Sequence, residues 1–398
     1  MQIRKKSSII VVDHNNGDDA LNKEKKKFKV SGTLIFNLAV GVITVFLMIY
    51  FIVSDGGMID LLKSRDGIIV GWLIVALAVF DMNIVMDAIV TFTFIRSKYP
   101  DLKFLQAIKI TCVGVFFSAI TPSSTGGQPM QLYLMSKMNI SVGFGSACMT
   151  QKFIVYQFVT MAFSIFAIVV KFDLFSGAFT GFWSSAFIIL GFAVQLGMTA
   201  LFIIVSFSSR LTKKLLALIG KILNKFKIKN ADGKLKKLSK EFEMFHTSNK
   251  ALMSDKKRMV LIYALVSVQV LLILSVPFFI YLALDMPKIA AEMNMPQGNW
   301  FNFICIQSFV LFTSNLIPLP GASGGAEAAF ALYYDPLFGF RTKPAIVIWR
   351  FITYYGAMIL TVPFSYYTKG HKEHSKEIEE ELEESLEEIP ENVSSGSE

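Results

Sequence analysis

The clusters Pro122-Ser-Ser-Thr-Gly-Gly127 and Pro320-Gly-Ala-Ser-Gly-Gly325 each interrupt an apolar stretch and share the pattern Pro-x-x-Ser/Thr-Gly-Gly. Twenty-five residues beyond each cluster, Lys152-Phe-Ile-Val-Tyr156 matches Arg350-Phe-Ile-Thr-Tyr354, so both matches have an offset of 198 residues. One short match would be weak evidence, but two in register predict an internal repeat. Repeats of this kind are typical of transporters built from two copies of one membrane unit.

The composition around these clusters indicates a membrane protein. Hydrophobic residues make up 53% of the 398 residues and charged residues only 17%, whereas soluble domains carry about 25% charge. A soluble enzyme, a disulfide-stapled secreted domain and a disordered chain are therefore excluded. The three cysteines, Cys112, Cys148 and Cys305, lie far apart inside apolar segments and predict neither a disulfide nor a Cys-rich metal site.

Long apolar runs predict an all-α polytopic membrane protein with six full transmembrane helices, because about 18 or more apolar residues can cross the bilayer as a helix. The six runs are 33–53, 67–95, 144–170, 182–208, 259–283 and 345–367. Two further runs break at the glycine clusters and predict re-entrant helical hairpins at about 104–138 and 300–338. Irregular backbone at membrane depth is tolerated only where protein or a watery cavity satisfies it.

Each copy of the repeat then holds three crossings and one hairpin, with boundaries at 33–170 and 182–367. Three is an odd number, so the second copy must be inverted, and the two hairpins must enter from opposite sides with their tips near the midplane. Short helices ending there would point backbone N–H groups and positive dipole ends at a ligand, which favours an anion such as a phosphate. The alternative is that the glycines and prolines only make tight turns.

The distribution of Lys and Arg predicts both termini in the cytoplasm, because short cytoplasmic loops carry the excess of basic residues. This places the polar segment 1–32, the insertion 209–258 and the acidic tail 368–398 inside. The insertion, rich in Lys and Arg, either lies along the anionic inner leaflet or only fixes the topology as a solvated loop. No nucleic-acid motif accompanies the basic charge, so no nucleic-acid partner is expected.

Charged residues at membrane depth are the candidate binding residues. Lys152 and Arg350 form an inverted pair suited to a phosphodiester, and Glu327 either receives a cationic group or pairs structurally with one of them. Asp81 and Asp87 do not share a helix face, so one of them lines the cavity. The full substrate-binding set is Asp81, Thr125, Gly126, Gly127, Gln128, Lys152, Tyr156, Ser323, Gly324, Gly325, Glu327, Arg350 and Tyr354. The sequence offers no catalytic constellation, metal-ligand cluster or cofactor motif.

The strings Thr121-Pro-Ser-Ser-Thr-Gly-Gly-Gln-Pro129 and Pro318-Leu-Pro-Gly-Ala-Ser-Gly-Gly-Ala-Glu327, with Lys152 and Arg350, resemble the lysylphosphatidylglycerol synthase transmembrane family. This is the flippase-like membrane region of the bacterial multiple peptide resistance factor. The resemblance implies movement of aminoacylated phosphatidylglycerol to the outer leaflet and resistance to cationic antimicrobial peptides. It also implies a bacterial cytoplasmic membrane location and a separate lipid-modifying synthase, because the cytosolic synthase domain of two-part members has no counterpart here.

The resulting expectation is a lipid flippase-like transporter whose partner is an anionic or aminoacylated phospholipid, with no cofactor. Three alternatives stay open. One is a membrane lysyltransferase that uses lysyl-tRNA, as the family label suggests, with Glu327 or Asp81 as base. The others are a secondary transporter of a small anion and a non-catalytic scaffold.

Overall fold

The computed structural model describes residues 68–121, 124–171, 182–208, 214, 216–221, 231–314 and 324–366. Within these ranges every regular element is a helix. Four helical segments are long and apolar enough to cross a membrane: Val70–Ile95, Val142–Val170, Lys256–Ala283 and Gly325–Phe364. The chain is therefore an all-α, multi-pass membrane protein, as the apolar runs indicated. The predicted span 33–53 lies outside the described residues.

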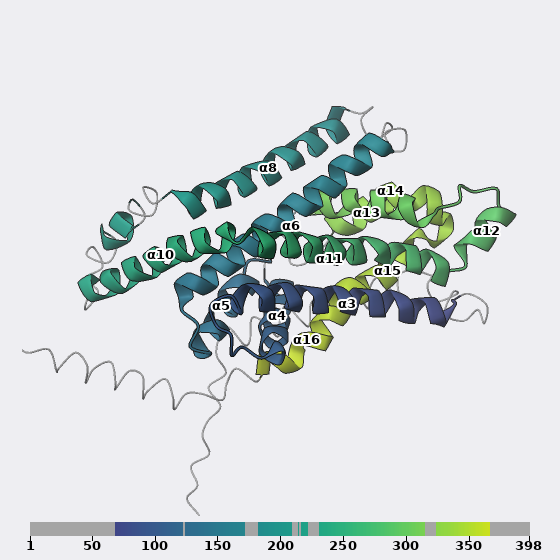
Figure 1. Ribbon diagram of the computed structural model, residues 1–398. Helices are drawn as coiled ribbons and strands as arrows, with labels where there is room; N and C mark the ends of the chain where they lie inside the picture. The colour runs from purple at the N-terminus through teal and green to yellow at the C-terminus, as the bar shows by residue number, and fades with distance from the viewer. Residues whose placement is uncertain are drawn as a thin grey trace, which may run out of the picture. The chain divides into compact units, whose positions relative to one another are not determined.

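Most predicted segments correspond to helices in the described ranges (Figure 1). The segment 33–170 contains α3 (Val70–Ile95), α4 (Phe104–Ala119), α5 (Gly127–Lys137) and α6 (Val142–Val170). The segment 182–367 contains α8 (Phe182–Phe207), α10 (Ala231–Ser254), α11 (Lys256–Ala283), α12 (Met286–Glu292), α13 (Trp300–Ser314), α14 (Gly325–Phe338), η4 (Gly339–Arg341), α15 (Thr342–Arg350), η5 (Phe351–Gly356) and α16 (Ala357–Tyr366). Within α8, the stretch Leu196–Phe207 is apolar.

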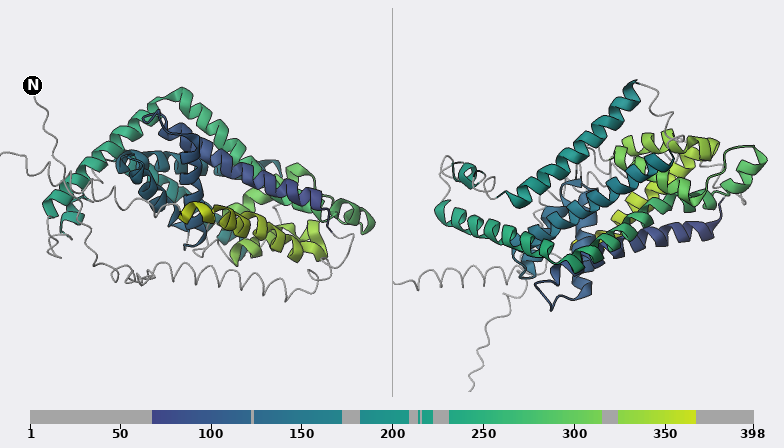
Figure 2. Two further views of the ribbon diagram at one scale, coloured as in Figure 1. Left: turned by 90° about the horizontal axis from the view of Figure 1, so that it is seen from below. Right: turned by 45° about the horizontal axis from the view of Figure 1, so that its top comes forward.

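Helices α3 and α11 lie side by side through the middle of the described structure (Figures 1 and 2). The backbone N–H of Ile69, just before α3, donates to the carbonyl of Ala283 at the end of α11 over 2.7 Å, so the two helices are antiparallel. Phe80 of α3 and Ile280 of α11 belong to one buried apolar cluster. This antiparallel pair is the central element of the described structure.

Two helix pairs are interrupted at the glycine clusters, α4–α5 and α13–α14. Helix α5 folds back on α4, where the Gln131 side chain donates to the carbonyl of Ile110 at 3.2 Å. Helix α14 likewise folds back on α13, where the Tyr334 hydroxyl donates to the carbonyl of Phe303 at 3.1 Å. The second helices of the pairs begin at Gly127 and Gly325, which preserves the offset of 198 residues. The intervening residues 122, 123 and 315–323 lie outside the described part of the chain.

The two helix pairs lie toward opposite ends of α3 and α11 (Figure 1). Phe104 of α4 packs edge-on against Phe92, near the end of α3, with ring centroids 5.6 Å apart. Phe303 of α13 packs against Tyr281, near the end of α11, at 4.9 Å. Because α3 and α11 are antiparallel, these two ends lie on opposite sides.

The last apolar run of the chain is less regular than its counterpart α6. Gly339 adopts φ 51°, a conformation that glycine tolerates and that separates α14 from α15. The segment Phe351–Gly356 is a π-helix, a local widening that is frequently found at functional sites. The sequence offered no sign of it. It begins directly after Arg350, whereas the corresponding stretch of α6 is ordinary α-helix.

Candidate functional site

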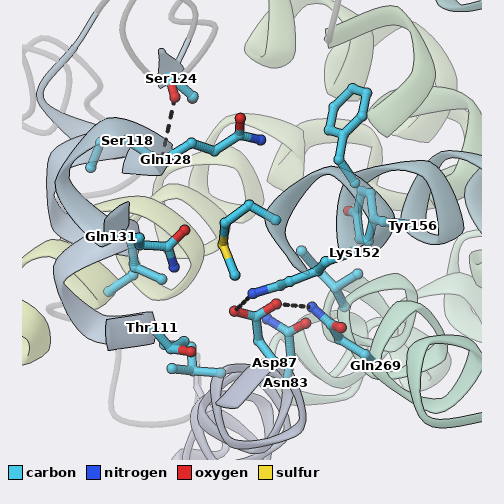
Figure 3. Close-up of a pocket in the computed structure, with 18 of the residues that line it drawn as sticks. Asn83, Asp87, Thr111, Ser118, Ser124, Gln128, Gln131, Lys152, Tyr156 and Gln269 are labelled. Carbon is cyan, nitrogen blue, oxygen red and sulfur yellow. Dashed lines mark hydrogen bonds and ion pairs between the residues drawn. The ribbon is translucent and has the colours of Figure 1, made fainter. Parts of the chain in front are cut away.

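A cavity of about 470 Å³, with a largely apolar wall that carries a group of polar side chains, lies among α3, α4, α5, α6, α11, the π-helix η5 and the start of α16 (Figure 3). Its size falls within the range of small-molecule sites. Its lining residues come from both of the segments 33–170 and 182–367. The polar residues at its wall are Asn83, Asp87, Thr111, Ser118, Ser124, Gln128, Gln131, Lys152, Tyr156, Gln269, Thr353 and Tyr354.

An ion pair between α6 and α3 forms one wall of this cavity. The Lys152 ammonium lies 2.6 Å from Oδ2 of Asp87 and donates a second hydrogen bond to Oγ1 of Thr91 at 2.9 Å. The side chains are 16% and 17% exposed, so the pair is shielded but reachable from the cavity. The Gln269 amide of α11 donates to the other carboxylate oxygen, Oδ1, at 3.1 Å. Lys152 therefore does not present an uncompensated positive charge.

Carboxamide groups from α5 extend toward the same space (Figure 3). Gln128 and Gln131 both line the cavity, and Gln131 is fixed by its hydrogen bond to α4. A side chain at Gly114 would collide with Gln131, so this glycine makes room for the amide. Amide and hydroxyl groups can both donate and accept, which suits the wall to a polar headgroup of either charge.

The second cation, Arg350, is held away from this cavity. Its Nε donates to Oε1 of Glu327 at 2.7 Å, and its guanidinium lies over the rings of Trp349 and Tyr354 at 5.1 and 5.7 Å from their centroids. Oε2 of Glu327 accepts from the backbone N–H of Gly324 at 2.6 Å, at the start of α14. Of the two roles considered for Glu327, the structure displays the pair with Arg350.

The predicted site residues divide into three groups. Lys152, Tyr156, Gln128 and Tyr354 line the cavity, and the Tyr354 hydroxyl donates to the carbonyl of Ala119 at 2.8 Å. Ser323 lies outside the described residues. The residues that do not line the cavity are Asp81, Thr125, Gly126, Gly127, Gly324, Gly325, Glu327 and Arg350.

The described glycines of the two clusters show packing and turn geometry. Gly126 donates its N–H to the Thr121 side chain at 2.8 Å, and Gly127 is buried against α4. Gly324 precedes α14 with φ 86°. Gly324 thus has a turn conformation that suits glycine, and a binding role for the glycines of both clusters stays a prediction.

Asp87, rather than Asp81, is the aspartate at the cavity, and three of its neighbours were not predicted. Asn83, Asp87 and Thr91 follow one another at four-residue spacing, which places them on one face of α3. That spacing was available in the sequence and would have favoured Asp87. Gln269 could have been noticed as a polar residue in the middle of a strongly apolar helix.

Comparison with known proteins agrees with this architecture. A curated protein of Archaeoglobus fulgidus, named UPF0104 membrane protein, is 25% identical over 264 residues, which cover 64% of this chain and 73% of the relative. No solved structure matches the chain. The family model described as the lysylphosphatidylglycerol synthase TM region matches residues 35–361, including every helix that lines the cavity. The chain thus belongs to the lysylphosphatidylglycerol synthase transmembrane family.

Proposed function

We propose that the protein is a lipid flippase-like transporter that moves aminoacylated phosphatidylglycerol, or a related lipid, between leaflets. The observation that carries this proposal is the cavity itself, which contains an ion pair and several amide and hydroxyl groups inside a bundle of apolar helices. Ionisable groups inside membrane proteins mark transport pathways because their burial is costly without a polar ligand or partner. Family membership supports a lipid-related role, and resistance to cationic antimicrobial peptides would follow from the change in surface charge.

The proposal includes six crossings and two oppositely directed re-entrant hairpins arranged as an inverted repeat. Three observations support it: the common offset of Gly127 and Gly325, the antiparallel α3 and α11, and the two helix pairs at opposite ends of them. The hydrogen bond from Tyr354 to Ala119 joins the tip region of the first hairpin to the second copy. With the basic residues inside, the termini would be cytoplasmic in a bacterial cytoplasmic membrane.

In the proposed transport cycle, the lipid phosphate would contact Lys152 first and Arg350 second. A phosphate entering from the inner leaflet would engage Lys152 and the cavity amides, and Arg350 would receive it toward the outer leaflet. The sequence has no ATP-binding motif, so the drive would come from a gradient or the membrane potential. Moving one net positive charge outward against the potential costs about 2.3 kcal/mol per 100 mV. Equilibration or ion coupling is therefore the mode that we propose.

Reconstitution with fluorescent lipids tests this function directly. In proteoliposomes we expect wild-type protein to exchange labelled aminoacylated phosphatidylglycerol between leaflets, and Lys152→Gln to lower the rate at least about tenfold, because one lost charge-assisted hydrogen bond is worth roughly 1.5–3 kcal/mol. Lys137→Gln is the matched control, since Lys137 is exposed on α5 and lies outside the cavity lining. Exchange no faster than in empty liposomes for any lipid, or equal rates for Lys152→Gln and wild type, would contradict the proposal. Flux of a soluble anion instead of a lipid would favour the small-anion transporter.

The insertion 209–258 contains a structured helix whose outer face fits the anionic leaflet. Helix α10 carries exposed lysines at 236, 237, 240 and 250. Its inner face is locked to α6: Glu241 accepts from the Gly143 N–H at 2.6 Å, and Asn249 accepts from Gln151 at 2.5 Å. Figure 2 shows α10 meeting α11 at an angle. We propose that this lysine face contacts acidic lipids.

Changing three of these lysines to glutamine at positions 236, 237 and 240 should weaken this contact without unfolding the helix. Each lysine near an anionic surface contributes about 1 kcal/mol, so lipid exchange should lose its preference for vesicles that contain phosphatidylglycerol over neutral vesicles. The measurement is the ratio of exchange rates in the two vesicle types. If the triple variant keeps the wild-type ratio, the alternative holds that the insertion only fixes the topology as a solvated loop.

A further inference from the structure

We propose that Asp87 and Thr91 form a binding site for a primary ammonium group, and that the Lys152 side chain is its built-in occupant, which gives way to the ammonium of an incoming headgroup. For a lipid headgroup this inference rests on the proposed function. The ammonium site itself stands on the geometry of α3 and α11.

The groups around the Lys152 nitrogen are those of a cation site. Oδ2 of Asp87 and Oγ1 of Thr91 lie 2.6 and 2.9 Å from it. The Thr91 hydroxyl donates its own hydrogen to the carbonyl of Asp87 at 2.9 Å and accepts from the Thr111 hydroxyl at 3.4 Å, so its oxygen keeps one lone pair for the ammonium. The Gln269 side-chain amide donates a hydrogen bond to the second carboxylate oxygen of Asp87, Oδ1. The acceptors are thus arranged by α3 and α11 and do not depend on α6.

Lys152 is a removable occupant of this site. It belongs to α6, and its ammonium sits at the end of a flexible four-carbon stem. The described neighbours use two of its three N–H bonds. Because Lys152 also lines the cavity, a rotation of its stem would bring the ammonium to a phosphate lying among Gln128 and Gln131 without moving the α3 oxygens.

The need to keep both Lys152 and Asp87 paired determines which headgroups the site can bind. At membrane depth an unpaired charge is costly, and breaking a shielded pair leaves one partner uncompensated. A headgroup with only a phosphate would draw Lys152 away and leave the Asp87 carboxylate without a cation. A headgroup with a phosphate and a primary ammonium would exchange partners, phosphate with Lys152 and ammonium with Asp87, so that every charge stays paired. The site therefore fits headgroups that carry both groups.

The test removes the Lys152 ammonium by substitution and supplies a small primary ammonium ion in solution. The full-length variant Lys152→Met, purified in detergent, should be stabilised by methylammonium chloride but not by tetramethylammonium chloride at equal ionic strength, because the latter has no N–H to donate. We expect a saturable rise in melting temperature of at least about 2 °C, as for any ligand that binds only the folded state. Wild type should show less than half of this rise, since its site is occupied.

The matched control is the double variant Lys152→Met/Asp87→Asn, which removes the site while keeping the charges balanced, and it should show no rise with methylammonium. An equal rise in the double variant, or none in Lys152→Met, would overturn the inference. If Lys152→Met is recovered only poorly, the monodisperse yield with each salt in the purification buffers replaces the melting temperature, and an equal yield overturns it. Because no lipid is involved, a positive result with failed lipid exchange would reject the transporter and keep the ammonium site.

Discussion

The variant Glu327→Gln should lose about 3 kcal/mol of stability, the largest effect that we expect from removing any single charge. Among the described side chains Arg350 is the one charged group in the buried class, 7% exposed, and Glu327 is its ion-pair partner. Removing one member of a buried pair costs about 3–5 kcal/mol because it strands the other. The lower end applies because the Glu327 side chain is 25% exposed. Chemical unfolding in detergent micelles measures the loss.

The double variant Glu327→Gln/Arg350→Met is the control for this prediction. It removes both charges and replaces the guanidinium by an apolar side chain that can keep packing near Trp349. Replacing a whole buried pair is often nearly neutral, so the double variant should recover most of the stability. Full wild-type stability of the single variant would show that Arg350 does not depend on Glu327. Lipid exchange by the double variant then separates the two roles: wild-type rates indicate a structural pair, and lost exchange indicates an outer receiving site.

Much of the helical arrangement could be predicted because it depends on local pattern. The length of an apolar run sets a membrane helix, and Pro and Gly set its breaks, so the bounds of α3, α6 and α11 and the start of α14 at Gly325 follow from the sequence. The two glycine clusters were visible for the same reason, because Gly324 has φ 86°, which glycine tolerates, and Gly127 lies too close to α4 to carry a side chain.

The partners of the charged residues could not be predicted because they depend on how distant helices pack. Lys152 meets Asp87 across 65 residues of sequence. The four-residue spacing of Asn83, Asp87 and Thr91 favours Asp87 as a cavity residue, but it does not identify Lys152 as its partner. The sequence left Lys152 and Arg350 as two possible partners of Glu327, and the fold places Arg350 beside it. The π-helix at Phe351–Gly356 has no known sequence signature, although it brings Tyr354 to the cavity.

The variant Gly127→Ala, at a point where α5 lies close against α4, gives the second large expected effect. A Cβ at Gly127 would collide with the Ser118 hydroxyl and lie 2.6 Å from the carbonyl oxygen of Gly114, so α5 must move away from α4. Overpacking of this kind costs about 1–3 kcal/mol, and the shift would displace the carboxamide of Gln131 that lines the cavity. We therefore expect lower melting temperature together with loss of lipid exchange.

Two further variants decide whether this effect comes from the contact between α4 and α5. Gly71→Ala on α3 is the matched control, because a Cβ there meets nothing within 4 Å, and it should leave stability unchanged or slightly raised since alanine favours helix. Adding Ser118→Ala to Gly127→Ala removes one of the two colliding atoms but leaves the Gly114 carbonyl, so it should restore part of the melting temperature and part of the exchange.

If Gly127→Ala behaves like Gly71→Ala, the hairpin does not hold the cavity wall in place. If the added Ser118→Ala restores stability but not exchange, the position of α5 matters for transport beyond its contribution to folding.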